Sequence, residues 1–442
     1  MPSQQPNIVF ILADDLGYAD VSCYGRRDFV TPNIDRIAAD GVRFTQAYAN
    51  SAVCTASRTA LMTGQYQYRL AIGLEEPLRS QSKRKIGLPP EHPTLPSLLK
   101  AAGYRTALVG KWHLGRLPDF GPLQSGYEQF YGFRGGVLDY YTHKFGPATT
   151  ETDDLWDDDT PVRQNGYLTD LLGNRAVNLI EAFARGSEPF LLSLHFNAPH
   201  WPWEAPGDEA EALRIKSLFH FDGGSQRTYQ RIVQRMDLQI GHVLQALDEA
   251  GIAGNTIVVF TSDNGGERFS DTWPFSGKKS ELLEGGLRVP TIVSWPDRVA
   301  RGSVSDQVTI TMDWLPTLLA AAGTTPARSH PSDGISLLPW ITAGAAPAPR
   351  KLYWRYKNLG QEAMRDGDWK YLKIRGNTFL FDIVQDPLER ANLKERHSDV
   401  YQRMIADWQV WNRTMLPLDP ESYTLGFTAA ELADHFGING RG

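Results

Sequence analysis

Residues 7–15 read NIVFILADD, a short segment that is apolar from residue 8 to residue 13 and ends on two aspartates. An apolar run of this length predicts a strand that is buried on both faces. Such strands are typical of parallel sheets covered by helices, in which ligands bind at the carboxyl ends of the strands. The segment therefore predicts an α/β sheet with Asp14 and Asp15 at its functional edge.

Short apolar strands and helical patterns continue to alternate along the chain as far as about residue 345. Further strands are predicted at residues 104–109, 190–196, 256–261 and 289–294. Apolar spacings of three and four, or Thr starts and Gly stops, predict helices that begin near residue 31 and at residues 94–102, 168–184 and 229–250. This alternation predicts the α/β class, with a mostly parallel sheet sandwiched by helices.

The pattern changes near the C-terminus. Residues 344–350 (GAAPAPR) are typical of a linker. Short antiparallel strands are predicted at residues 352–356, 363–366, 369–374 and 378–382, and a helix at residues 401–411. We therefore predict two domains, residues 1–345 and 346–442, of which the second is a small α+β unit with a short antiparallel sheet.

The overall charge excludes two classes of partner. The 442 residues include 45 basic and 51 acidic side chains, a net charge of −6, so we expect neither nucleic acid nor an anionic membrane as partner. Residues 1–6 (MPSQQP) lack the basic and apolar regions of a secretory signal, which predicts a cytoplasmic protein; a periplasmic or secreted location is the alternative for a trimmed mature chain. With two cysteines, the chain has no disulfide framework.

Oxygen donors gather after two of the predicted strands. Asp14 and Asp15 follow the first strand, and Asp263 and Asn264 follow the strand at residues 256–261. Adjacent carboxylates repel each other, and a bound cation is the simplest compensation. This set favours Ca²⁺ or Mg²⁺ over zinc, which prefers His and Cys. Taken singly, both segments are also ordinary turn sequences.

Basic side chains follow the strands as well. Lys111 and His113 alternate on an extended segment and can point to one side, although a surface basic pair is the simpler interpretation. His200 lies in a proline-flanked loop, where a structural histidine is the alternative. Lys278 and Lys279 precede a glycine-dependent turn, and both could equally be solvated surface residues. Together these groups would bind an anion.

Cys54 precedes a predicted helix that runs from about residue 56 and stops at Gly64. Backbone N–H groups at a helix N-terminus favour anions, and Arg58, one turn along, could contact the same anion. An inert core cysteine and a catalytic thiolate are both compatible with this position.

Several motifs together resemble one family. Residues 54–58 (CTASR) and 61–64 (LMTG) are similar to the signature of type I sulfatases, and residues 110–115 (GKWHLG) are similar to the second signature of that family. Further blocks match in the right order at residues 13–18 (ADDLGY), 197–200 (NAPH), 262–265 (SDNG), 279–286, 333–337 (DGISL) and 380–382 (LFD). The chain thus resembles the formylglycine-dependent, arylsulfatase-like members of the alkaline phosphatase superfamily, whose fold we expect here.

The resemblance implies a modified nucleophile. In this family a maturation enzyme oxidises the motif cysteine, here Cys54, to formylglycine, an aldehyde that hydrates to a gem-diol. The resemblance also implies a cation, Ca²⁺ with Mg²⁺ as the alternative, bound by the hydrated residue 54 together with Asp14, Asp15, Asp263 and Asn264. Ala56 stands where the family usually has proline, which leaves open which maturation system acts on Cys54 and how completely.

The remaining roles come from the same resemblance. Arg58 and Lys111 would hold the hydrate and the sulfate oxygens, and Asp263 would act as the base for the hydrate. His113 would assist breakdown of the sulfated intermediate. His200 and Lys279 would bind sulfate and support the leaving oxygen, with Lys279 preferred over Lys278 by its spacing from Glu284.

We therefore expect a sulfuric ester hydrolase that cleaves an aryl or carbohydrate sulfate monoester. A phosphonate monoester hydrolase or phosphodiesterase of the same superfamily is the nearest alternative, and a catalytically idle binding protein is the alternative from another class. Trp201 and Trp203 could stack on a substrate ring or pack the loop that carries them. The charged loop at residues 65–87 is a candidate for shaping the mouth of the pocket.

Overall fold

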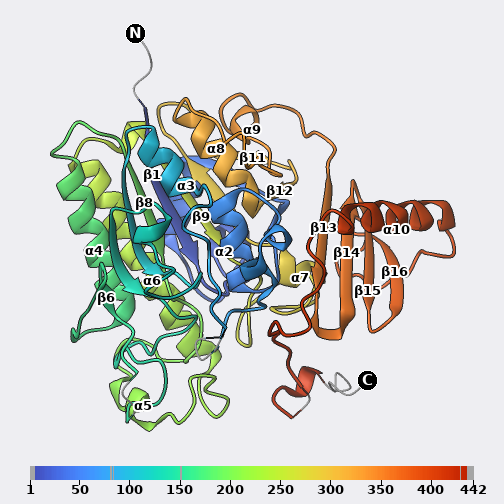
Figure 1. The fold of residues 1–442 in the computed structure, drawn as a ribbon, viewed down its shortest axis with the longest axis horizontal. Helices are drawn as coiled ribbons and strands as arrows, with labels where there is room; N and C mark the ends of the chain where they lie inside the picture. Colours follow the sequence, from blue (N-terminus) through green and yellow to red (C-terminus); the bar gives the residue numbers. More distant parts are fainter. Residues whose placement is uncertain (1–4, 80–81, 83, 150–151, 429, 436–442) are drawn as a thin grey trace.

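A computed structural model describes residues 5–79, 82, 84–149, 152–428 and 430–435 (Figure 1). Its centre is a ten-stranded sheet. In spatial order the strands are β11 (Ser303–Ser305), β2 (Gly41–Phe44), β10 (Thr291–Ser294), β9 (Thr256–Ser262), β1 (Asn7–Ala13), β8 (Phe190–His195), β4 (Arg105–Lys111), β5 (Gln129–Phe133), β6 (Trp156–Asp157) and β7 (Thr160–Pro161).

The sheet is mostly parallel, as predicted. β1 lies between β8 and β9 and runs parallel to both, and β4 runs parallel to β8 and β5. The strand predicted at residues 289–294 is shorter, and as β10 it pairs antiparallel with both β9 and β2. Strand direction was not predictable there, because an apolar run shows burial but not orientation.

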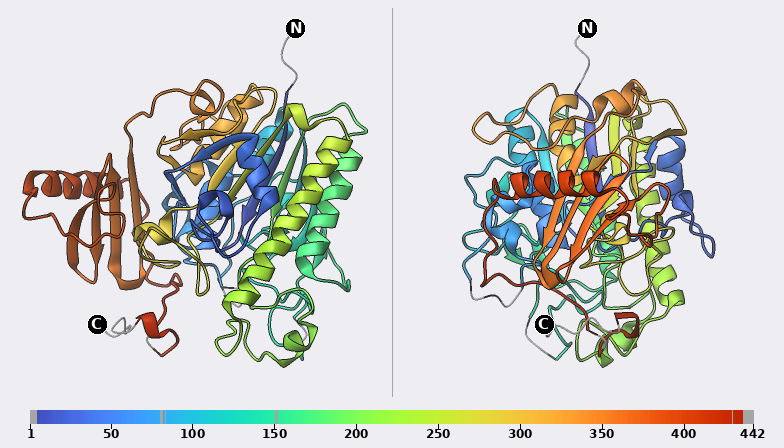
Figure 2. Two further views of the ribbon diagram at one scale, coloured as in Figure 1. Left: turned by 180° about the vertical axis from the view of Figure 1, so that it is seen from behind. Right: turned by 90° about the vertical axis from the view of Figure 1, so that its right-hand side faces the viewer.

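Alternate residues of β1 face two separate cores. Val9 and Ile11 belong to one apolar cluster, and Ile8, Phe10 and Leu12 belong to the other. Helices cover both faces, with α4 and α6 side by side on one of them (Figure 2). The helices of the first core are α1 (Pro32–Ala39), α4 (Leu168–Phe183) and α6 (Gln226–Glu249); those of the second are α2 (Cys54–Thr63), α3 (Leu95–Ala101), α8 (Trp314–Ala321) and α9 (Leu338–Thr342).

Three smaller features complete this part of the chain. β3 (Ala47–Tyr48) and β12 (Thr309–Ile310) form a parallel pair. α5 (Glu209–Arg214) lies in the loop region after β8, and α7 (Glu284–Leu287) precedes β10. No helix in the described ranges is both long enough and apolar enough to cross a membrane.

The C-terminal part forms the predicted antiparallel sheet. Its four strands are β13 (Lys351–Tyr356), β14 (Gln361–Asp366), β15 (Trp369–Ile374) and β16 (Asn377–Asp382), and α10 (Ser398–Asn412) packs across β14 and β15. This sheet shares an apolar cluster with α2, and the indole of Trp354 donates to the carbonyl of Ala49 at 2.9 Å. The boundary between residues 345 and 346 stays a prediction.

Candidate active site

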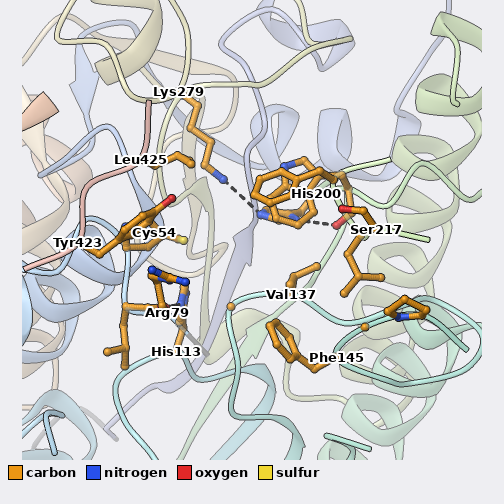
Figure 3. Close-up of a pocket in the computed structure, with 18 of the residues that line it drawn as sticks. Cys54, Arg79, His113, Val137, Phe145, His200, Ser217, Lys279, Tyr423 and Leu425 are labelled. Carbon is orange, nitrogen blue, oxygen red and sulfur yellow. Dashed lines mark hydrogen bonds between the residues drawn. The ribbon is translucent and has the colours of Figure 1, made fainter. Parts of the chain in front are cut away.

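A cavity of about 510 Å³ opens at the carboxyl ends of the central strands (Figure 3). Segments from very different parts of the chain line it, from Cys54 on α2 to Tyr423 and Leu425 near the C-terminus. Its remaining lining residues are Pro77, Leu78, Arg79, His113, Gly136, Val137, Phe145, Gly146, Pro147, His200, Trp201, Lys216, Ser217, Leu218, Phe219 and Lys279.

The helix α2 places Cys54 in its first position, two residues earlier than predicted, and Arg58 one turn later. Both side chains are buried. The guanidinium of Arg58 donates from Nε and Nη2 to Oδ2 of Asp263 at 3.0 and 2.9 Å, and from Nη1 to the carbonyl of Lys111 at 3.1 Å. Burial raises the pKa of the Cys54 thiol, although Lys111 and Lys279 oppose this effect. The thiol is therefore held in its neutral form.

The four oxygen-donor residues meet beside Cys54. The backbone N–H of Asp15 donates to Oδ1 of Asp263 at 3.2 Å, and Nδ2 of Asn264 donates to Oδ1 of Asp15 at 2.7 Å. Ligand atoms of Asp14, Cys54 and Asp263 all lie within 4.8 Å of one another, and all three residues are buried. Chain segments almost 250 residues apart in sequence thus converge on one point, as the strand-end argument predicts.

Two observations show that this cluster suits a cation. Oδ1 of Asp14 and Oδ1 of Asn264 are buried and accept no hydrogen bond from any described residue. Burial raises the pKa of Asp14 to about 8, against the opposing charge of Lys111 and with the support of nearby Asp263. A carboxyl group in that state would be ionised only beside additional positive charge. An all-oxygen set with unpartnered lone pairs fits Ca²⁺ or Mg²⁺.

Two lysines approach the same aspartates. Lys111 is the last residue of β4, which extends two residues beyond its predicted end, and its Nζ donates to Oδ2 of Asp14 at 2.6 Å. Lys279 Nζ donates to Oδ2 of Asp15 at 2.6 Å and lies 3.2 Å from Nε2 of His200. Both ammonium groups are buried. The neighbouring Lys278 points elsewhere and pairs with Asp434.

The two histidines of the cavity are held as neutral rings. Nε2 of His113 lies 2.8 Å from the carbonyl oxygen of Leu78, and Nδ1 of His200 lies 2.7 Å from that of Trp201. A carbonyl only accepts, so each contact places the ring proton on that nitrogen and leaves the other nitrogen as an acceptor. Burial lowers the pKa of both rings, and the adjacent lysines lower it further. Nδ1 of His113 has no hydrogen-bond partner among the described residues.

Glycine permits the close contacts around this site. Gly110 has φ +112°, and a Cβ atom there would lie 1.8 Å from the carbonyl oxygen of His195 on the neighbouring strand. A Cβ atom on Gly136 would lie 2.4 Å from Cε1 of His113. Any side chain at either position would displace β4 or the imidazole of His113.

The two tryptophans after His200 differ in their surroundings. Trp201 lines the cavity, with its ring centroid 4.5 Å from that of Phe219. Trp203 is 1% exposed, packs against Phe269 at 4.9 Å and does not line the cavity. Trp201 is therefore placed to contact a substrate ring, whereas Trp203 packs inside the protein.

Some cavity or site residues lie outside the sequence-based set. His195, the last residue of β8, places Nδ1 3.3 Å from the carbonyl of Lys111 and 3.4 Å from Nη1 of Arg58. Because His195 lies inside the strand, a pattern of polar residues beyond the strand ends does not include it. Tyr423 lines the cavity from the C-terminal segment, and no local pattern distinguishes it. Arg79 also lines the cavity, and it belongs to the charged loop at residues 65–87 that the sequence indicates as a candidate for shaping the pocket mouth.

Comparison with known proteins now identifies the family. The model of the sulfatase family matches residues 6–324, which include all the site residues described above except those of the C-terminal segment. The chain belongs to the sulfatase family. A second model, that of the C-terminal region of N-sulphoglucosamine sulphohydrolase, matches residues 276–409 of this sulfatase. The fold and the sulfuric ester hydrolase activity expected from the sequence are thereby confirmed.

Individual relatives agree with this assignment. Human N-acetylgalactosamine-6-sulfatase is 34% identical over 80% of this chain and 69% of its own length, and human arylsulfatase A is 32% identical over 88% and 79%. The crystal structure of Ps i-CgsB in complex with k-i-k-neocarrahexaose is 29% identical, covers 98% of both chains and superimposes with a TM-score of 0.85. This sulfatase therefore shares nearly its whole architecture with a solved structure.

Proposed function

We propose that this enzyme hydrolyses a sulfate monoester carried by a saccharide, with a formylglycine derived from Cys54 as the nucleophile. The observation that carries the proposal is the cluster of Cys54, Asp14 and Asp263, with ligand atoms within 4.8 Å of one another, of which Cys54 lines the cavity. The saccharide class rests on two of the relatives, one named for an N-acetylgalactosamine sulfate and one solved with a neocarrahexaose.

Formylglycine fits this position better than cysteine. The cluster consists of hard oxygen donors, which suit an oxygen nucleophile rather than a soft thiolate. When hydrated, formylglycine supplies such an oxygen, and its second hydroxyl allows sulfate to be released from the enzyme. Because Cys54 is only 1% exposed, the maturation enzyme that we propose as partner must reach it before the chain folds.

Asp14, Asp15, Asp263 and Asn264 would hold one divalent cation, Ca²⁺ or alternatively Mg²⁺. When bound, the ion supplies positive charge that acidifies the nucleophile and polarises the sulfate. Asp263 also holds Arg58 by two hydrogen bonds, so the guanidinium stays directed at the floor of the cavity. Arg58 and Lys111 would bind the sulfate oxygens as negative charge develops on them.

Lys279 and His200 would together transfer a proton to the leaving group. Lys279 is protonated and lies 3.2 Å from Nε2 of His200, the nitrogen left as an acceptor. A proton can therefore pass from this pair to the departing alkoxide oxygen. His113 presents the free lone pair of Nδ1 to the cavity, where it would take a proton during breakdown of the sulfated intermediate.

Release of inorganic sulfate from a panel of sulfated saccharides, alkyl sulfates and 4-nitrophenyl sulfate tests the proposal. We expect turnover of at least one sulfated saccharide, dependent on residue 54. A phosphonate monoester serves as the comparison, because a phosphonate monoester hydrolase shares the fold with a TM-score of 0.64 at 19% identity. Faster hydrolysis of the phosphonate than of every sulfate ester would contradict the proposal.

A further inference from the structure

The cavity is lined by three cationic side chains and by two neutral imidazoles. The cations are Arg79, Lys216 and Lys279, the imidazoles are those of His113 and His200, and no described acidic residue lines the cavity. The proposed reaction uses His113, His200 and Lys279 near the floor. Arg79 and Lys216 remain without a role in binding the reacting sulfate.

Arg79 is held in the cavity wall by the C-terminal segment. Its guanidinium lies 5.1 Å from the centroid of the Tyr423 ring, and Figure 3 shows the two side chains together on the Cys54 side of the cavity. The backbone of Tyr423 is itself fixed, since its N–H donates to Oε2 of Glu75 at 3.2 Å and its carbonyl accepts from the N–H of Glu76 at 2.9 Å. Arg79 is exposed, and its contact with Tyr423 fixes the position of its guanidinium.

Lys216 lines the cavity and precedes Ser217 in the segment after α5. Figure 3 shows Ser217 on the other side of the cavity from Arg79. Neither Lys216 nor Arg79 forms an ion pair with a described carboxylate, whereas basic residues just outside the cavity do. Arg214 pairs with Glu211 at 2.5 Å, and Lys278 pairs with Asp434. Positive charge is therefore left uncompensated where the cavity opens.

Aromatic rings line the same cavity as the two cations. Phe145, Trp201, Phe219 and Tyr423 all line the cavity, and Trp201 and Phe219 lie against each other with an interplanar angle of 32°. Flat apolar faces of this kind pack against the apolar faces of sugar rings. The volume of about 510 Å³ lies within the range of pockets that enclose a small organic ligand.

We infer that Arg79 and Lys216, one on each side of the cavity mouth, bind anionic groups other than the reacting sulfate, and so select saccharides that carry a further sulfate or carboxylate group. The inference deepens the proposed function and rests on it. A single sulfate would be satisfied at the floor, so the two unpaired cations would recognise a second anionic group on the same molecule.

Kinetics with matched disaccharides tests this site. The substrates are one galactose-based disaccharide with a single sulfate, the same disaccharide with a second sulfate, and an analogue with a uronate carboxylate in place of the second sulfate. We expect kcat/KM of the enzyme to be about tenfold higher for at least one doubly charged substrate, and this preference to shrink at high salt. Comparison of the disulfated disaccharide with the uronate analogue shows whether the second group that is recognised is a sulfate or a carboxylate.

Arg79→Gln and Lys216→Gln should each reduce this preference several-fold while leaving 4-nitrophenyl sulfate, which has no second anion, unaffected. Arg396→Gln is the matched control, because Arg396 is exposed and does not line the cavity. Equal turnover of singly and doubly charged disaccharides, or equal losses on all substrates in the variants, would overturn the inference. Absence of turnover on every sulfate ester would count against the proposed function instead.

Measurements of substrate binding test the inference without any turnover. In a Cys54→Ala background, calorimetry should show that the preferred doubly charged disaccharide binds more tightly than the singly charged one, and that Arg79→Gln removes the difference. If both disaccharides bind equally in the Cys54→Ala protein, no second anion site exists.

Discussion

Lys279 and Asp15 form a buried ion pair, with Nζ 2.6 Å from Oδ2 and both side chains 1% exposed. The carboxylate counters the effect of burial, which alone would lower the pKa of the lysine, so that this pKa is raised overall. The ammonium group therefore stays protonated at neutral pH, beside the imidazole of His200.

Lys279→Ala should reduce hydrolysis of unactivated saccharide sulfates far more than that of 4-nitrophenyl sulfate. A poor leaving group needs a proton in the transition state, and general acid catalysis contributes about 10²–10⁴-fold. Lys278→Ala is the adjacent control and should be nearly silent, because Lys278 pairs with Asp434 rather than with Asp15. Comparison of kcat across leaving groups measures the effect; equal damage to all esters would show that Lys279 binds sulfate without donating a proton.

Removal of the divalent cation should abolish activity, and Ca²⁺ or Mg²⁺ should restore it. Asp263→Asn should lose both the bound metal and turnover, because the substitution removes one carboxylate ligand. The amide oxygen of the new side chain can still accept a hydrogen bond from Arg58, so the position of Arg58 should be retained. Elemental analysis with parallel activity assays makes the measurement. Stoichiometric zinc, together with full activity after Ca²⁺ and Mg²⁺ are stripped, would refute the assignment.

A buried charge cluster should stabilise the junction between the two parts of the chain. Lys370 on β15 lies 3.0 Å from Glu284 and 2.9 Å from Glu389, and all three side chains are fully buried. Lys370→Ala should lower the free energy of unfolding by about 3–5 kcal/mol, because the buried Glu389 loses its cationic partner while Glu284 keeps its ion pair with Arg288. Lys373→Ala, which breaks the partly exposed pair with Glu362, should cost less than about 1 kcal/mol. Similar losses in the two variants, measured by urea denaturation, would contradict this account.

Stability should also depend on the protonation of Glu76. Burial raises the pKa of this carboxyl from 4.5 to about 7, although its Oε2 accepts from the backbone of Lys357 and from Thr424. Between these pH values the native state keeps a proton that the unfolded chain has lost, so stability falls as pH rises from about 4.5 to about 7 and is flat above.

Glu76→Gln should remove this pH dependence. The difference in unfolding free energy between the variant and the natural protein should grow by an amount on the order of 3 kcal/mol across that window. Urea denaturation of both proteins at several pH values checks the sign. A constant difference would mean that Glu76 is ionised in both states.

Much of the catalytic part could be predicted from the sequence, because its signals are local. The apolar run at residues 7–13 coincides with β1, and the site residues follow strands whose ends meet at one edge of the sheet. β4 continues two residues past its predicted end at Val109. Gly110 is a weak strand residue, which predicts an earlier end, but the close approach of His195 requires a glycine there.

Other features depend on contacts between distant segments. The charge of the loop at residues 65–87 indicates a place at the pocket mouth, but the position of Arg79 within the cavity wall depends on Tyr423, more than 300 residues away in sequence, whose ring packs against its guanidinium. β10 runs antiparallel to both of its neighbours, β9 and β2, and so its direction is a property of the assembled sheet. Neither composition nor periodicity of these segments carries that information.

The central claim is that residue 54 acts as formylglycine, and mass spectrometry combined with activity tests it most directly. The peptide that contains residues 54–58 should be lighter by one sulfur and two hydrogens and heavier by one oxygen, and specific activity across preparations should rise in proportion to the converted fraction. Cys54→Ala should fold and be inactive. Full specific activity in protein whose residue 54 is entirely unmodified cysteine would contradict the account and require a thiolate mechanism.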